Sequence, residues 1–184
     1  MKAPSRFVLG GILGAAAIVG AGLALHVRAQ SLPADALAHA HAKFELTARA
    51  PLEHVAPLFG ADRERVWSPG WNPRFLYPNP AADQRGMVFT VSHHNRDSIW
   101  INTQLDLKNG VVQYVYVIPN ALATMITLKL TAQGAQTHVE VEYERTALTT
   151  DANAHVRQLS EQDQKSGPEW QRQINSYLEK PGTK

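Results

Sequence analysis

Hydrophobic and polar residues alternate through most of the chain between residues 74 and 147, as they do in strands buried on one face. This pattern predicts strands at residues 74–78, 86–94, 98–107, 111–118, 121–132 and 137–147. A separate alternating stretch predicts a first strand from Phe44 to Arg49. Asn109-Gly110 predicts a tight hairpin turn of the primed type, and the other connections are also short. Consecutive strands should therefore pair as an antiparallel meander.

Two segments have the helical period instead. Residues 51–67 place apolar side chains at helical spacing with an interruption at Gly60, which predicts two short helices. Residues 149–180 predict a long helix that begins with Asp151 as its N-cap and that Gly167-Pro168 should bend or break.

This order of elements predicts an α+β fold. A curved antiparallel sheet of about seven strands should wrap around the long C-terminal helix, with the two short helices after the first strand. Such an arrangement leaves a ligand cavity between helix and sheet rather than a solid core.

The first 29 residues have a composition of their own. A basic start at Lys2 and Arg6 is followed by an uncharged run from Phe7 to Leu25 and by a small-x-small cleavage site ending at Ala29. This is the pattern of a secretory signal peptide, but the run is also just long enough for an uncleaved membrane anchor. Both alternatives place the rest of the chain outside the cytoplasm, in the periplasm or cell envelope. Residues 30–42 read as a linker and 43–180 as the folded domain.

Composition narrows the chemistry. With 44% hydrophobic and 18% charged residues, the 184-residue chain suits one ordinary domain plus an appendage. Three of the 18 basic residues lie in the first 29 positions, so the remaining 15 face 16 acidic ones and give no case for nucleic-acid binding. The absence of cysteine excludes disulfides, thiolate nucleophiles and cysteine-ligated zinc.

The stretch RVWSPGWNPRF, residues 65–75, holds two of the four tryptophans in the chain. Large, partly polar rings are costly to leave in water, so Trp67 and Trp71 should pack over an apolar space. One interpretation is that one of them only anchors the turn. The alternative is that at least one touches a ligand.

Three motifs in this order of elements resemble the SRPBCC superfamily over roughly residues 43–179: RVWSPGWNP, GMVFTV and VEVEYERTALT before the closing helix. This superfamily has the helix-grip fold of START lipid-transfer domains, birch-pollen allergens and polyketide cyclase-like proteins, and the chain is most similar to its uncharacterised bacterial members. The resemblance implies a binding partner that is a small hydrophobic, lipid-like or polyketide-like molecule. Because the superfamily includes carriers, cyclases and hydratases, the fold does not settle the function.

Alternation assigns side chains to the cavity face of the predicted strands. In the strand at 98–107 it places Ile99, Ile101, Leu105 and Leu107 inward and Trp100 outward. The predicted ligand-binding residues are Trp67, Trp71, Phe89, His93, Tyr114, Tyr116, Ile126, Tyr143, Arg145, Leu159, Trp170 and Ile174. Arg145 shares the apolar face, where it either clamps a ligand, pairs with a carboxylate of the protein, or turns to water.

Catalytic and metal motifs are sparse. His93 and His94 project to opposite faces of a strand, and His39 and His41 lack a third ligand, so no metal site is expected. No cofactor is expected either, because the chain has no glycine-rich phosphate loop; it also lacks a GxSxG elbow and an HExxH motif.

Three functions stay open. The first is an exported or membrane-tethered protein that binds a small hydrophobic ligand. The second, implied by the cyclase-like relatives, is a cyclase- or dehydratase-like enzyme that would use His93 and Tyr116 with Arg145 on a carbonyl compound. The third is an envelope interaction module with a filled core and no ligand.

Overall fold

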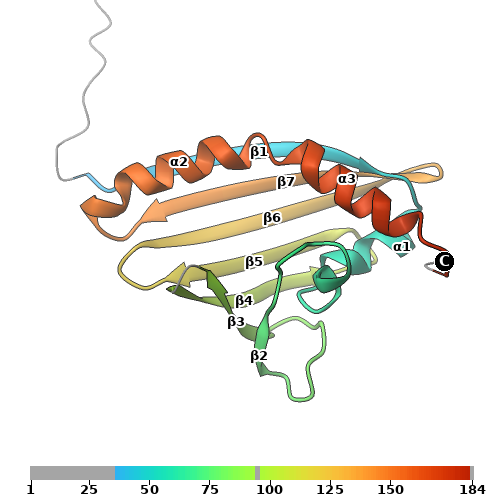
Figure 1. Ribbon diagram of the computed structural model, residues 1–184, viewed down its shortest axis with the longest axis horizontal. Helices are drawn as coiled ribbons and strands as arrows, with labels where there is room; N and C mark the ends of the chain where they lie inside the picture. The colour runs from blue at the N-terminus through green and yellow to red at the C-terminus, as the bar shows by residue number, and fades with distance from the viewer. Residues whose placement is uncertain (1–35, 94–95, 183–184) are drawn as a thin grey trace, which may run out of the picture. The chain divides into compact units, whose positions relative to one another are not determined.

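The computed structural model describes residues 36–93 and 96–182, with the backbone alone at His93 and Arg96. The described part contains a seven-stranded antiparallel sheet in the order β1-β7-β6-β5-β4-β3-β2 (Figure 1). Its strands are β1 His39–Ala48, β2 Arg74–Tyr77, β3 Val88–His93, β4 Arg96–Asp106, β5 Val111–Ile118, β6 Leu122–Gln133 and β7 Gln136–Ala147. The predicted meander is thus confirmed, and β1 completes the sheet beside β7.

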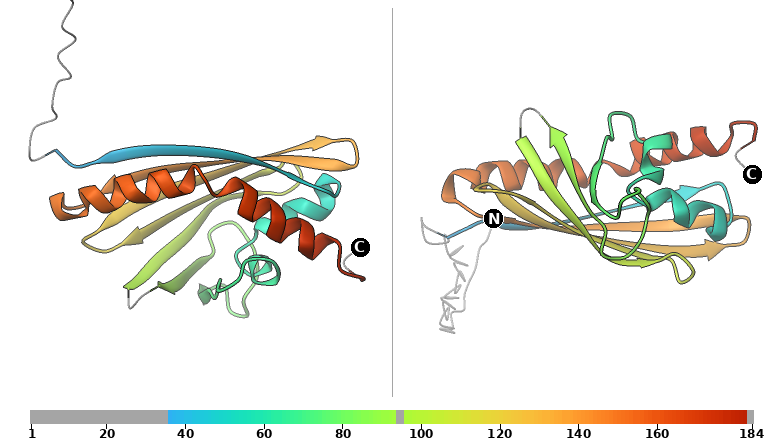
Figure 2. Two further views of the ribbon diagram at one scale, coloured as in Figure 1. Left: turned by 45° about the horizontal axis from the view of Figure 1, so that its top comes forward. Right: turned by 90° about the horizontal axis from the view of Figure 1, so that it is seen from below.

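Helical segments follow β1 and β7. The first set is α1 Leu52–Val55, η1 Ala56–Phe59 and η2 Arg63–Val66, and the second is η3 Thr150–Ala152, α2 Asn153–Asp163 and α3 Gly167–Leu178. Helices α2 and α3 follow one another across one side of the sheet, along β1 (Figures 1 and 2). The predicted fold class, a curved antiparallel sheet with a long C-terminal helical region, is confirmed.

The C-terminal helices are fastened to β1 by buried polar side chains. Asn175 of α3 accepts the backbone N–H of Arg49 at 2.8 Å and donates to the carbonyl of Thr47 at 3.1 Å. Ser160 of α2 donates to the carbonyl of His41 at 3.2 Å. These hydrogen bonds therefore fix the C-terminal helices α2 and α3 against the first strand.

β1 begins earlier than predicted. It starts at His39, five residues before Phe44, and residues 39–42 pair with residues 143–146 of β7. These positions lie inside the segment 30–42 that the sequence pattern assigned to a linker. Alanine is a weak strand former, so the alternation of buried Ala38 and Ala42 with exposed histidines gave little signal. The proposed signal or anchor segment, residues 1–29, lies outside the described residues.

The predicted break at Gly167-Pro168 is confirmed, because α2 ends at Asp163 and α3 begins at Gly167. A Cβ atom at position 167 would lie 2.7 Å from the backbone oxygen of Glu45, so glycine permits this close approach of helix to strand. The prediction of Asp151 as an N-cap is wrong. Asp151 lies in η3, and α2 begins at Asn153 without a side-chain cap.

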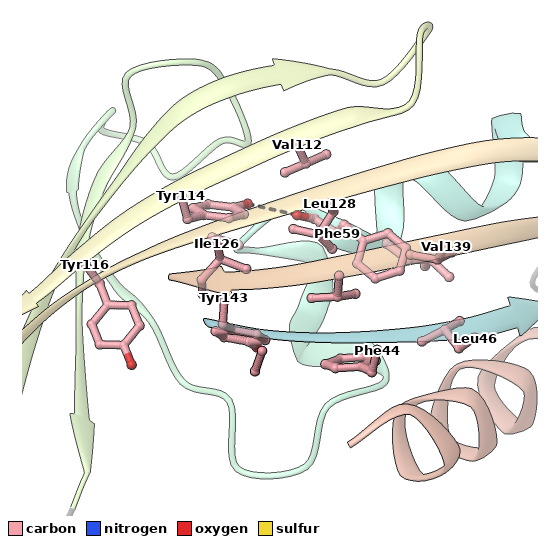
Figure 3. Close-up of a cluster of buried hydrophobic side chains, with 14 of the residues drawn as sticks. Phe44, Leu46, Phe59, Val112, Tyr114, Tyr116, Ile126, Leu128, Val139 and Tyr143 are labelled. Carbon is pink, nitrogen blue, oxygen red and sulfur yellow. Dashed lines mark hydrogen bonds between the residues drawn. The ribbon is translucent and has the colours of Figure 1, made fainter. Parts of the chain in front are cut away.

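The space between the sheet and the helices is filled largely by side chains from β1, β5, β6 and β7. Figure 3 shows Phe44 and Leu46 of β1, Tyr114 of β5, and Ile126 and Leu128 of β6 in this cluster. All five are buried. The faces predicted for β5, β6 and β7 are therefore confirmed.

β4 departs from the prediction halfway along its length. Ile99 and Ile101 are 44% and 43% exposed, whereas Trp100 packs against the core and Asn102 is buried. The pairing with β5 slips between Asn102 and Gln104, and this β-bulge moves the inward face from even to odd positions. The predicted orientation of Ile99, Ile101 and Trp100 was therefore wrong, while Leu105 and Leu107 do pack against the core.

Within residues 36–93 and 96–182, every helix is too short or too polar to cross a membrane.

Candidate ligand-binding cavity

A cavity of about 720 Å³ opens between the central strands and α2. We call it the outer cavity. Its walls come from β4 to β7, from the segment between β7 and α2, and from Trp71, and they comprise Trp71, Ser98, Trp100, Tyr116, Ile118, Asn120, Ala121, Ile126, Tyr143, Arg145, Thr149, Asp151, Ala152, His155 and Leu159. Apolar and aromatic side chains dominate these walls, as is usual for small-molecule sites.

A second space of about 90 Å³, here called the inner chamber, adjoins the outer cavity. The two share Trp71, Trp100, Ile126 and Tyr143 as walls. The remaining lining residues of the inner chamber are Glu64, Ser68, Tyr114, Leu128 and Trp170. Shared walls place both spaces around one aromatic cluster.

The two tryptophans of the turn have different roles. Trp67 is 5% exposed, donates its Nε1–H to the carbonyl of Leu58 at 2.7 Å, and packs edge-on against Phe59 and Trp170. Trp71 donates its Nε1–H to the carbonyl of Ala61 at 2.7 Å but lines both spaces. One tryptophan therefore anchors the turn, and the other forms part of the cavity wall.

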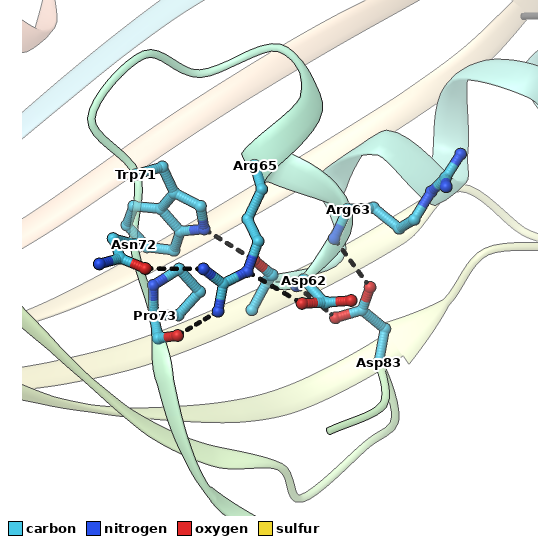
Figure 4. Close-up of polar contacts among 8 residues, drawn as sticks. Asp62, Arg63, Arg65, Trp71, Asn72, Pro73 and Asp83 are labelled. Carbon is cyan, nitrogen blue, oxygen red and sulfur yellow. Dashed lines mark hydrogen bonds and ion pairs between the residues drawn. The ribbon is translucent and has the colours of Figure 1, made fainter. Parts of the chain in front are cut away.

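The exposed Arg65 stabilises this turn through hydrogen bonds. Its guanidinium donates to Asn72 Oδ1 at 2.7 Å, to Asp62 Oδ1 at 2.9 Å, and to the carbonyl of Pro73 (Figure 4). The planar fork of an arginine suits several acceptors at fixed positions. The position of Trp71 is thus set by a hydrogen-bonded loop rather than by packing alone.

Asp83 connects the same turn to the loop before β3. Its carboxylate accepts the backbone N–H groups of Asp62 at 2.8 Å and Arg63 at 3.2 Å (Figure 4). Burial raises the pKa of Asp83, although these two hydrogen bonds oppose the rise. A Cβ atom at Gly60 would lie 2.3 Å from Asp83 Oδ2, so glycine leaves room for this contact.

Arg145 lies inside the protein, with 4% of its surface exposed. Its Nε and Nη2 atoms form a bidentate pair with Asp163 of α2 at 2.6 and 2.9 Å, and Nη1 donates to Tyr116 Oη and to Thr124 Oγ1. Burial lowers the pKa of Arg145, but the bonds to Asp163 and Tyr116 raise it above its ordinary value overall. Of the three alternatives left open by the sequence, Arg145 adopts the pair with a protein carboxylate.

The aromatic walls are in mutual contact. Trp100 stacks on Tyr116 with ring centroids 4.2 Å apart and meets Trp71 edge-on at 5.3 Å. Tyr114 donates its hydroxyl to the carbonyl of Phe59 at 2.8 Å (Figure 3). Burial raises the pKa of Tyr114 and Tyr143 well above the usual value, so both rings stay neutral at physiological pH.

Glu64 is the charged residue of the inner chamber. In the three-residue repeat of η2 it lies on the same side as Trp67, while Arg63 and Arg65 are exposed. Within residues 36–93 and 96–182, no hydrogen bond or ion pair engages its carboxylate. Burial, and secondarily the charge of Asp83, raise the pKa of Glu64 well above its ordinary value of 4.5.

Eight of the twelve predicted ligand-binding residues line these spaces. Trp71, Tyr116, Ile126, Tyr143, Arg145 and Leu159 line the outer cavity, and Tyr114 and Trp170 line the inner chamber. Trp67, Phe89 and Ile174 are instead buried in the core behind the walls, and the side chain of His93 lies outside the described part. Contact with a ligand stays a prediction for all of them.

Sequence reasoning missed Glu64 and Trp100 in the walls, and Asp163, which lies behind the wall as the partner of Arg145. Asp163 follows Leu159 by four positions, and Glu64 precedes Trp67 by three, so helical spacing could have placed both beside their predicted neighbours. Trp100 carried no such signal because the bulge in β4 reverses its face. Among the described residues there is no group of three or more histidine, aspartate or glutamate side chains that could hold a metal ion.

No family model matches this sequence, and no curated protein matches it either. Solved structures do. Norcoclaurine synthase from Thalictrum flavum aligns with a TM-score of 0.56 at 10% identity, over 95% of this chain and 98% of that one. The protein Ara h 8.0201 aligns with a TM-score of 0.55 at 17% identity, over 77% of this chain and 98% of that one.

A third similar structure, CalU16 from Micromonospora echinospora, aligns with a TM-score of 0.53 at 13% identity, over 82% of this chain and 89% of that one. Identities this low establish the fold and not the activity. The fold that these structures share with this chain is the helix-grip fold, as predicted from the sequence.

Proposed function

We propose that this protein binds a small, largely hydrophobic molecule in the outer cavity. The observation that supports this proposal is a space of about 720 Å³ with predominantly aromatic and aliphatic walls. Ligand pockets for small molecules span roughly 300–1,000 Å³ and have this kind of lining. The solved structure of norcoclaurine synthase with dopamine and hydroxybenzaldehyde is one similar fold that holds small aromatic molecules.

The charges in the outer cavity favour a ligand without an anionic group. The guanidinium of Arg145 is already matched by Asp163 in a bidentate pair. A ligand carboxylate would have to compete with an internal partner that is covalently part of the protein. We therefore expect Arg145 to fix α2 against β7 and to present Tyr116 to the ligand.

Two other functions from the sequence analysis are less well supported. An envelope interaction module with a filled core would have no need of a cavity, whereas this protein has one of about 720 Å³. An acid-base enzyme stays a prediction that rests on Tyr116, whose hydroxyl accepts a hydrogen bond from Arg145, and on His93, whose side chain is outside the described residues.

Export stays part of the proposal, on the basis of the sequence of residues 1–29 alone. Fractionation of the source cell and the intact mass of the isolated protein provide the test. A chain beginning near residue 30 in the envelope fraction is expected for cleavage, and a full-length chain in the membrane fraction for an anchor. A full-length chain in the cytoplasmic fraction would contradict both.

Native mass spectrometry of the protein isolated from its source tests ligand binding directly. We expect a co-released apolar molecule at fixed stoichiometry. Leu159→Trp, which adds a ring to the cavity wall on α2, should abolish this adduct. Arg157→Trp adds the same ring on the exposed side of α2 and should retain it. A folded Leu159→Trp variant with an undiminished adduct would contradict the proposed site.

A further inference from the structure

The inner chamber combines aromatic walls with a single acidic group. Five of its nine lining residues are aromatic: Trp71, Trp100, Tyr114, Tyr143 and Trp170. Glu64 is the charged one, and no lysine, arginine or histidine lines this chamber. The faces of aromatic rings attract cations, and tryptophan does so most strongly.

The carboxylate of Glu64 lacks the partner that a partly buried charge requires. A carboxylate removed from water without a hydrogen bond or a counter-charge is costly. The Glu64 side chain is partly buried rather than fully removed from water, and among the described residues none gives its carboxylate a hydrogen bond or a counter-charge. A cation from outside the chain would supply the missing counter-charge.

The charges around the two spaces do not supply that cation. Arg145 is neutralised by Asp163, and Asp83 adds a second acidic group near Glu64. Asp151 lines the outer cavity on the α2 side. With Arg145 paired to Asp163, the titratable side chains left among the described lining residues, apart from the tyrosines, are the acidic Glu64 and Asp151 and the imidazole of His155, and the two acidic groups favour a positively charged ligand group.

We propose that the inner chamber binds the ammonium group of an amphipathic amine whose apolar part lies in the outer cavity. The ammonium would lie against the aromatic walls, donate to the Glu64 carboxylate, and have the Ser68 hydroxyl as a further acceptor. This proposal rests on the proposed function, because the apolar part of the amine needs the outer cavity. It adds the chemical class of the ligand and the residue that selects it.

The dimensions of the chamber limit what the cation is. Its volume of about 90 Å³ corresponds to about three water molecules at roughly 30 Å³ each. A primary or methylated ammonium group fits that volume, whereas a second ring system does not. The bulk of the ligand must then lie in the outer cavity, with which the chamber shares Trp71, Trp100, Ile126 and Tyr143 as walls.

Proton release accompanies this mode of binding. Burial holds the pKa of Glu64 high in the empty protein, and an ammonium beside it favours the ionised form. The other titratable groups near Glu64 are Asp83, Tyr114 and Tyr143, and both tyrosines stay neutral because their pKa values are raised. Over the pH range in which Glu64 is protonated in the empty protein, binding of an amine in its ammonium form should therefore release a proton from Glu64 into the buffer.

Octylamine, octan-1-ol and octanoate form a matched set of probes for the full-length protein. Isothermal titration at neutral pH should show octylamine binding about tenfold or more tightly than octan-1-ol, and octanoate binding most weakly. Glu64→Gln should remove the preference for the amine over the alcohol. Glu53→Gln makes the same change of charge at an exposed position on α1 and should keep the preference.

A second measurement needs no variant. Titration of octylamine in two buffers of different ionisation enthalpy should reveal proton release, while octan-1-ol should show none. Equal affinities for amine and alcohol, or an amine preference that survives in Glu64→Gln, would overturn the ammonium site and leave the hydrophobic cavity standing. Failure of all three probes to bind the folded protein would overturn the proposed function itself.

Discussion

At the scale of single residues, the ion pair of Arg145 and Asp163 has a direct consequence for stability. It joins β7 to α2 inside the protein, with side chains 5% and 12% exposed. A buried ion pair is weak evidence of net stabilisation, but the loss of one member leaves an uncompensated charge.

Asp163→Ala should therefore lower the free energy of unfolding by about 3–5 kcal/mol, because Arg145 then lies buried without its counter-ion. The double substitution Asp163→Leu with Arg145→Met should recover most of the loss. Urea unfolding of the three proteins checks this. Glu161→Ala, at an exposed position on the same helix, is the control and should have little effect. Equal stability of wild type and Asp163→Ala would show that the pair is not buried in solution.

Glu64 should make stability depend on pH. Its pKa is raised in the folded protein above the ordinary value of 4.5, so between the unfolded and folded pKa values the folded state binds more protons than the unfolded state. Stability then falls as pH rises through this window and is constant above the folded pKa. Glu64→Gln lacks this titration, so its stability advantage over wild type should grow across the same window. Urea unfolding at a series of pH values measures the difference, and parallel pH profiles for the two proteins would contradict it.

The sequence identified many wall residues because strand alternation is a strong local signal. Tyr116, Ile126 and Tyr143 were placed on the cavity face in this way, and they line the cavity. Asp163 and Glu64 were missed because they are polar residues that reach inward from helical segments. Their burial depends on contacts with distant elements, which no local pattern records.

At the scale of elements, the turns and bulges decide which side chains face inward. The bulge between Asn102 and Gln104 moves Trp100 onto the cavity wall. A pattern read through β4 with one constant period therefore fails for its first half. The predicted Asn109-Gly110 turn lies where expected, but the prediction of a primed type was wrong, because within this pair Gly110 has a positive φ and Asn109 does not, and the connection from Asp106 to Val111 has four residues.

Two hairpin glycines allow a matched test of local packing. Gly110 and Gly134 both have positive φ, at +68° and +63°, but a Cβ atom at Gly110 would lie 2.2 Å from the backbone oxygen of Leu130. At Gly134 a Cβ atom would meet nothing within 4 Å. Gly134→Ala should cost about 1 kcal/mol from backbone strain alone, and Gly110→Ala clearly more because β5 and β6 must also separate. Thermal unfolding compares the two, and equal losses would show that the contact with Leu130 relaxes freely.

At the scale of the whole molecule, ligand binding and stability are linked. α2 and the turn that carries Trp71 are more than eighty residues apart in the sequence, and both contribute walls to the outer cavity. A ligand that contacts both should stabilise the folded state without binding the unfolded chain. At a free ligand concentration 100 times Kd, we expect about 2.7 kcal/mol of added stability. Differential scanning fluorimetry should show a higher Tm with octan-1-ol for wild type, and no change for Leu159→Trp.

The fold as a whole could be predicted because element order and short connections leave few arrangements for a meander followed by a long helix. The extension of β1 to His39 could not, since it depends on pairing with β7 at a separation of more than one hundred residues. The inner chamber could not be predicted either, because side chains from η2, β5, β7 and α3, which are far apart in the sequence, form it together.

The clustering of all four tryptophans gives the protein an optical signature of its own. Trp71 and Trp100 meet at 5.3 Å, Trp67 and Trp170 meet at 5.4 Å, and both pairs lie at steep interplanar angles. Indole transitions held so close and so obliquely should couple and give a split band in circular dichroism. Three of these rings, Trp71, Trp100 and Trp170, line the two spaces. Ligand binding should therefore change both this band and the tryptophan fluorescence, so that binding can be followed in the unlabelled protein.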